Sequence, residues 1–245
     1  MSAAHDFSIP GLLLLLGGSW LAAAISGVAG FGGALLLLPV LVHVVGPLAS
    51  VPLLTLAQLV GNLSRAGLGW REIQWQPVGL FLAGALPAAV IGAALFTQLS
   101  GQGLKVLIAI FLIVLVALRR LTLLPQSIRR RWLVPGGALV GFLSGAVGSA
   151  GPLGAALFLS LNLMPLAYIA SEAVTALAMH CGKMVIYQRS LHLNMAEWAL
   201  GLGMGAAMFG GTWTGRRVVQ RLNRAQFLLL VDACLIVGAL SLLVN

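Results

Sequence analysis

The sequence contains little charge, and very little of it is negative. Only 8% of the 245 residues are charged, and five acidic residues stand against fourteen lysines and arginines. A soluble globule needs more polar surface than this, and a cation site needs carboxylates, so the composition disfavours both. The two cysteines, Cys181 and Cys234, form neither a CxxC motif nor a secreted disulfide pattern. They therefore indicate no disulfide scaffold and say nothing about the redox compartment.

Apolar residues and glycines make up most of the chain. Apolar residues account for 60% of it, there are 31 glycines, and the mean hydropathy is +1.05. This composition predicts a bundle of membrane-spanning helices, each of about 20 largely apolar residues. The net charge of +9 lies in short gaps between apolar runs, which is typical of topology signals and not of nucleic-acid binding. No Lys or Arg precedes the apolar run that begins at Ile9, so we expect no cleavable signal.

A glycine-broken segment occurs twice, 118 residues apart. The residues SGVAGFGG at 26–33 return as SGAVGSAG at 144–151, and PLA at 47–49 returns at 165–167. Nine of the 25 positions from Ser26 to Ser50 are identical to their counterparts. In a membrane chain, paired interrupted helices in corresponding halves are typical of a transporter's binding site.

Each half of the chain shows the same order of segments. Repeat 1 (residues 1–122) has a broken stretch at 11–46 and helices at 48–66, 76–98 and 103–121. A basic linker at 123–131 leads to repeat 2 (132–245), with a broken stretch at 132–163 and helices at 165–187, 194–215 and 223–244. The broken stretches are too long for one span and short for two, so we expect re-entrant hairpins buried in the bundle. The alternative is that the glycines only allow close helix packing.

The basic residues test this topology. If each hairpin enters and leaves on one side, each half crosses the membrane three times and the halves are inverted repeats. One face then collects Arg65, Arg71, Arg119, Arg120, Arg129, Arg130, Arg131, Arg216, Arg217, Arg221 and Arg224, and the other only Lys105, Lys183 and Arg189. The positive-inside rule makes the arginine-rich face cytoplasmic and puts both termini outside. The expected fold is an all-α polytopic membrane protein of two inverted repeats.

Polar side chains follow each break on the next helix. In repeat 1 they are spaced as one helix face, and in repeat 2 the aligned helix carries a less regular set. The two sets are Thr55, Gln58, Asn62 and Arg65, and Glu172, Thr175, His180 and Lys183. Such groups at membrane depth usually face the interior or a cavity. The alternative is that the cations extend to the interfaces while the amides join helices.

The breaks and these sets together predict a small-anion site. A half-helix that starts at a break directs unbonded N–H groups and a positive dipole end into the bundle. The predicted substrate-binding residues are Gly32, Gly33, Ala34, Gln58, Asn62, Arg65, Ser149, Ala150, Gly151, Thr175, His180 and Lys183. Glu172 and Asp232 are candidates for ion coupling, and Asp232 is equally a candidate for an internal salt bridge. We predict no cofactor and no metal.

The doubled pattern resembles the sulfite exporter TauE/SafE family over residues 11–244. The pattern is a Ser-Gly start, a glycine-rich break, a half-helix, a Gly-Pro or Met-Pro turn and a polar-striped helix. By resemblance, Gly30–Gly33 and Gly148–Gly151 occupy the family's breaks, and Thr55 and the run His180, Gly182, Lys183 match family forms. The resemblance implies a bacterial inner-membrane transporter that moves sulfite, thiosulfate or sulfonates outward. Ser149 and Ala150 depart from the glycine run that is common in the family's breaks.

Three functional classes are compatible with these features. The first is an exporter of small sulfur-containing anions that works by alternating access around a midplane site. The second is a proton-coupled importer or a channel for other small anions. The third, an intramembrane hydrolase using Ser144 and His180, is disfavoured because no GxSG or HExxH pattern is present and no histidine accompanies the repeat twin Ser26. We therefore predict no enzyme. The predicted partners are the anion and the lipid bilayer but no nucleic acid, and a homodimer remains open.

Overall fold

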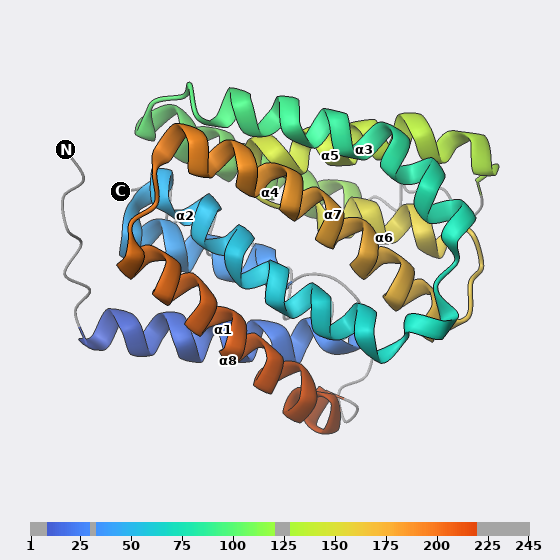
Figure 1. The fold of residues 1–245 in the computed structure, drawn as a ribbon, viewed down its shortest axis with the longest axis horizontal. Coiled ribbons are helices and arrows are strands. Elements are labelled where there is room, and N and C mark those ends of the chain that lie inside the picture. The colour runs from blue at the N-terminus through green and yellow to red at the C-terminus, as the bar shows by residue number, and fades with distance from the viewer. Residues whose placement is uncertain (1–8, 30–32, 121–127, 220–245) are drawn as a thin grey trace.

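The structure is a computed structural model that describes residues 9–29, 33–120 and 128–219. No strand occurs in these ranges, and the chain forms a bundle of helices (Figure 1). Gly30–Gly32, the linker residues 121–127 and the segment predicted at 223–244, with Asp232, lie outside the described residues. The helices are α1 (Ile9–Ala29), α2 (Gly33–Leu68), α3 (Trp75–Phe96), α4 (Gly101–Arg120), α5 (Leu133–Val147), α6 (Gly151–Leu159), α7 (Pro165–Leu191) and α8 (Met195–Val219). Two short 3-10 turns, η1 (Trp70–Glu72) and η2 (Arg130–Trp132), precede α3 and α5.

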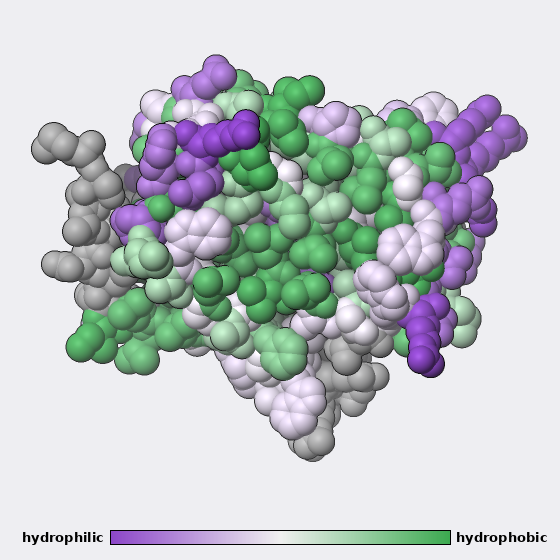
Figure 2. Space-filling model, in the orientation of Figure 1, coloured by the Kyte–Doolittle hydropathy of each residue, from purple (hydrophilic) through white to green (hydrophobic). Residues whose placement is uncertain are grey.

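Three of the described helices are long and apolar enough to cross a bilayer. They cover Leu36–Gly67 in α2, Trp75–Phe96 in α3 and Leu166–Leu191 in α7. On the face drawn in Figure 2, hydrophilic residues gather towards the two ends of the long axis, and mainly apolar side chains lie between them. Exposed arginines at 71 and 129–131 lie at the start of α3 and α5, next to the exposed indoles of Trp70 and Trp132. An apolar band with Arg and Trp at its edge is typical of a membrane protein.

Glycines with positive φ interrupt the helical path at two places. Gly46 has φ 79° and ψ 165° inside α2, directly before Pro47. Gly148 ends α5 with φ 90°. A side chain is disfavoured at such angles, so glycine is the residue that allows both turns. The chain then restarts as a helix, with Pro47 after the first turn and with Gly151 and Pro152 after the second, where the missing proline N–H costs least.

Small residues bring α3 and α5 into backbone contact. Gly137, Gly141 and Gly145 are spaced four apart on α5, and a Cβ on any of them would collide with a carbonyl oxygen of α3. The carbonyls belong to Phe81, Ala85 and Ala89. Membrane helices gain much of their association from such close van der Waals packing, so this pair is a principal packing interface of the fold.

The pair α1 and α8 packs in a related way. A Cβ on Gly211 of α8 would collide with the carbonyl oxygen of Trp20 in α1, and Gly203 lies beside Leu16. The pairs α3–α5 and α1–α8 make the most extensive helix contacts, and α7 packs against both α2 and α3. The arrangement brings the last part of α2, the middle of α7 and the interruption after α5 together in the core.

Candidate functional site

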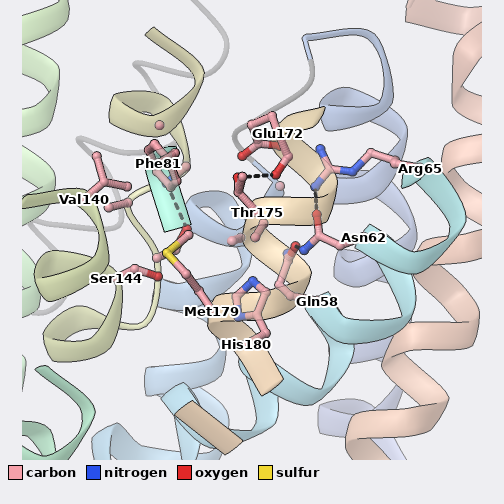
Figure 3. A pocket seen from close by; sticks show the side chains of 17 residues that line it. Gln58, Asn62, Arg65, Phe81, Val140, Ser144, Glu172, Thr175, Met179 and His180 are labelled. Atoms are coloured by element: carbon pink, nitrogen blue, oxygen red, sulfur yellow. Dashed lines mark hydrogen bonds between the residues drawn. The ribbon is translucent and has the colours of Figure 1, made fainter. Parts of the chain in front are cut away.

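A buried cavity lies between the start of α2, the last part of α2, the turn from α5 to α6, and α7. Its volume is about 40 Å³, which is room for about three water molecules at roughly 10–15 Å³ each, or for a small oxyanion. The lining residues come from five helices and the turn between α5 and α6 (Figure 3). They are Gly33, Ala34, Gln58, Asn62, Arg65, Phe81, Val140, Ser144, Ser149, Ala150, Gly151, Gly154, Glu172, Thr175, Ala176, Met179 and His180.

Most of the residues predicted from the sequence line this one cavity. Ten of the twelve predicted substrate-binding residues do so, and the coupling candidate Glu172 joins them. Gly32 and the second coupling candidate, Asp232, lie outside the described residues. Lys183 is described but does not line the cavity. Whether the lining residues bind an anion stays a prediction.

The polar residues of α2 form a chain of hydrogen bonds along one helix face. Arg65 Nη2 donates to Asn62 Oδ1, Asn62 Nδ2 donates to Gln58 Oε1 at 3.5 Å, and Gln58 Nε2 lies 4.0 Å from the sulfur of Met208. Gln58 and Asn62 are buried, and Arg65 is half-buried. Because each side chain holds the next, the guanidinium of Arg65 is kept at the cavity wall (Figure 3).

Across the cavity from these side chains, α7 contributes two polar atoms that lack a hydrogen-bond partner within the described chain. Among the described residues, the buried atoms Glu172 Oε2 and His180 Nδ1 have no hydrogen-bond partner. Thr175 differs from them, because its hydroxyl donates to the backbone oxygen of Glu172 at 2.8 Å. Unpaired buried polar atoms are costly, so both atoms are available to bind water or a ligand in the cavity.

Two helices begin at the cavity. α2 starts at Gly33 and α6 at Gly151, and both residues line the cavity. The first N–H groups of a helix lack intrahelical acceptors and carry the positive end of the helix dipole. In α6, Gly151 N–H makes only a long bond of 3.4 Å to Ser149 Oγ, while Leu153 and Gly154 already donate to Ala150. Both helix starts therefore make this cavity favourable for an anion.

Lys183 aligns with Arg65 in the repeat, but unlike Arg65 it does not line the cavity. Its side chain is fully buried, and its ammonium donates to Ser144 O at 3.2 Å, Ser144 Oγ at 2.9 Å and Gly148 O at 3.0 Å. Tyr187, one turn later, donates to Gly145 O at 2.9 Å. α7 thus satisfies the last carbonyls of α5, which would otherwise be unpaired in the bundle. Lys183 stands behind the cavity wall.

Sequence reasoning missed the apolar wall and one polar residue. Phe81, Val140, Ala176 and Met179 carry no signal in a chain that is mostly apolar, although Ala176 and Met179 share a helix face with Glu172 and His180. Ser144 entered the sequence analysis only as a nucleophile. Ser26 is the corresponding residue in repeat 1, and this match is the sequence signal that could have placed Ser144 in the site.

Comparison with known proteins gives one family. The model of the family described as "Sulfite exporter TauE/SafE" matches residues 14–242, which is nearly the whole chain. No curated protein and no solved structure matches the chain.

Proposed function

The chain belongs to the sulfite exporter TauE/SafE family of membrane transporters, and from this premise we propose that it exports small sulfur-containing anions through the cavity between α2, α6 and α7. Sulfite, thiosulfate and organosulfonates are the substrates that we propose. Each offers a compact group with several oxygen acceptors.

The observation that carries the proposal is the character of the cavity. Two helix starts and Arg65 place positive potential on a buried volume of about 40 Å³. The side chains of Gln58, Asn62 and His180 add amide and imidazole groups. Among the described lining residues, Glu172 is the one acidic side chain, and it opposes this potential with a single carboxyl group. Such a site favours a small oxyanion over a cation.

The path of α5 and α6 supports a re-entrant hairpin. Arg130, just before α5, hydrogen-bonds Gln76 in the first turn of α3. The backbone N–H of Gln74, also at the start of α3, donates to Ser171 Oγ in the second turn of α7 at 2.9 Å. The chain therefore enters α5 and enters α7 at the same end of the bundle (Figure 1).

The path of α1 and α2 supports a second hairpin that opens at the opposite end. Leu16 lies beside Gly203 and Trp20 beside Gly211, so α1 runs in the same direction as α8. α8 starts where α7 ends, far from the end that carries the start of α3. The turn at Gly46 lies next to the start of α4, at the end of the bundle where α8 starts. Two hairpins that open to opposite ends support inverted repeats.

We place the protein in the bacterial inner membrane with its arginine-rich end in the cytoplasm and both termini outside. Arg71 and the arginines at 129–131 lie at one end of the described bundle, whereas Arg189 lies at the other. Alternating access then consists of movement of one repeat against the other around the cavity.

Counterflow in proteoliposomes tests this proposal. Vesicles that hold the purified protein are loaded with sulfite, thiosulfate, sulfoacetate, sulfate or acetate, and the uptake of labelled sulfite from outside is followed. We expect exchange with the first three anions and none with acetate. Equal exchange with acetate, or exchange with no sulfur-containing anion, contradicts the proposal.

The second candidate function is a proton-coupled importer or an anion channel. Glu172 Oε2, which has no hydrogen-bond partner among the described residues, supports its proton-coupled form. Together with Asp232, Glu172 is our candidate for the coupling proton. An imposed pH gradient separates this candidate from a simple exporter. Under coupling, the gradient drives sulfite against its concentration in wild-type protein but not in Glu172→Gln. An exporter that is not coupled shows no difference between the two proteins.

A further inference from the structure

Ser144, in the wall of the cavity, and Lys183, behind that wall, form a polar pair. Ser144 lines the cavity, and its Oγ accepts a hydrogen bond from the Lys183 ammonium at 2.9 Å. We propose that Ser144 is a further anion-binding residue, and that Lys183 is a positioning residue that acts on the anion through it. This inference rests on the proposed function, because it names additional residues of the same site.

The ammonium of Lys183 has no capacity left for direct contact with an anion. It has three protons, and three acceptors surround it: Ser144 O, Ser144 Oγ and Gly148 O, at 3.2, 2.9 and 3.0 Å. Its side chain is fully buried and does not line the cavity. It therefore makes no hydrogen bond to the anion itself, and beyond its charge it acts on the anion through the groups that it holds.

The Ser144 hydroxyl is the group that can transmit this effect. An ammonium only donates, so it occupies a lone pair of Oγ and directs the hydroxyl hydrogen away from itself. Within the described chain, no residue accepts that hydrogen. A buried donor that lines a cavity and has no protein acceptor is available to a ligand. A donor polarised by a neighbouring cation also makes a stronger hydrogen bond.

Lys183 also removes an obstacle to anion binding. The last carbonyls of α5 carry the negative end of its helix dipole, and Ser144 places this helix end in the cavity wall. Without a cation, these carbonyls would repel an anion. The ammonium donates to one of them, at Ser144, and to the carbonyl of Gly148 directly after the helix.

The two aligned cations thus have different tasks. Arg65 and Lys183 are separated by the 118-residue repeat distance, yet only Arg65 lines the cavity. Lys183 lies outside the cavity and donates hydrogen bonds to Ser144 in its wall.

Equilibrium binding of labelled sulfite to the purified full-length chain tests the role of Ser144. A hydrogen bond to a charged group contributes about 1.5–3 kcal/mol, so we expect Ser144→Ala to raise the Kd for sulfite about tenfold or more. The matched control is Ser19→Ala on α1, where an equally buried serine donates to its own helix at Leu15 O. This control should bind as wild type. Unchanged affinity in folded Ser144→Ala overturns the proposal.

A double-mutant cycle tests the role of Lys183. We expect Lys183→Met alone to weaken binding and Lys183→Arg to restore part of the affinity. In the Ser144→Ala background, Lys183→Met should weaken binding less than it does alone, because the part of its effect that passes through the hydroxyl is already lost. Full additivity shows that Lys183 does not act through the hydroxyl. If Lys183→Met does not fold, Lys183→Gln takes its place in the cycle. If neither folds, Lys183 is needed for the fold itself, and its positioning role is overturned.

The outcomes separate this inference from the proposed function. If wild type and Ser19→Ala bind no sulfur-containing anion, the proposed function fails. If both bind sulfite and Ser144→Ala binds it equally well, only the inference fails.

Discussion

Arg65→Gln is the substitution for which the structure predicts the largest change in anion affinity. Arg65 is the one cation that lines the cavity within the described chain, and it is held there by Asn62. Glutamine keeps a donor amide at this position, so we expect the hydrogen-bond chain on α2 to survive. What is lost is a positive charge at the wall of a buried cavity.

The magnitude follows from the burial of the site. Unit charges about 4 Å apart attract by about 4 kcal/mol at the effective dielectric constant typical of a protein surface. Arg65 is half-buried, so solvent screens part of this attraction. We expect a loss of about 2 kcal/mol, which corresponds to an increase of about thirtyfold in the Kd for sulfite.

Isothermal titration of purified protein with sulfite measures this change. Arg65→Lys keeps the charge but loses the planar fork, so it should show an intermediate loss. Arg71→Gln removes the same charge from the exposed turn η1 and is the matched control. Two results refute the reasoning: a Kd for Arg65→Gln within about twofold of wild type in folded protein, or an equal loss in Arg71→Gln, which would assign the effect to general surface potential.

Three further predictions concern the backbone and the coupling candidate. Gly141→Ala should lower the melting temperature of the protein, because its Cβ collides with α3 backbone, whereas Gly79→Ala, which has open space, should not. Gly148→Ala should cost about 1–2 kcal/mol in unfolding free energy, because its φ of 90° is unfavourable for alanine, and a fully stable variant would show that the turn relaxes freely. Glu172→Gln should leave counterflow intact but abolish any drive by a pH gradient, and a retained pH drive would remove Glu172 from the coupling candidates.

The sequence was most informative where backbone conformation depends on residue type. Gly46 with Pro47 and Gly148 with Pro152 are signals that few other residues can mimic, and the helix path is interrupted at both places. The spacing of Gln58, Asn62 and Arg65 likewise determines that they share a helix face, whatever surrounds that face. These local rules sufficed to bring most predicted site residues to one cavity.

Tertiary contacts decided what local rules could not. Alignment of the repeats pairs Lys183 with Arg65, but it does not show that the carbonyls at the end of α5 need a hydrogen-bond donor. That need arises only when α7 packs against the end of α5. The hydroxyl of Ser144 acquires its neighbour through the same contact, so its place in the site could not be read from the chain.

The pairing of α1 with α8 has a consequence for how the protein is made. α1 is the first described helix to leave the ribosome, and its most extensive partner, α8, emerges nearly last. α3 likewise waits for α5. A cut between α4 and α5 would separate α1 from α8, α3 from α5, and α2 from both α7 and α8. The early helices therefore insert before their most extensive partners are made, and the two fragments could complete their packing only by joining each other.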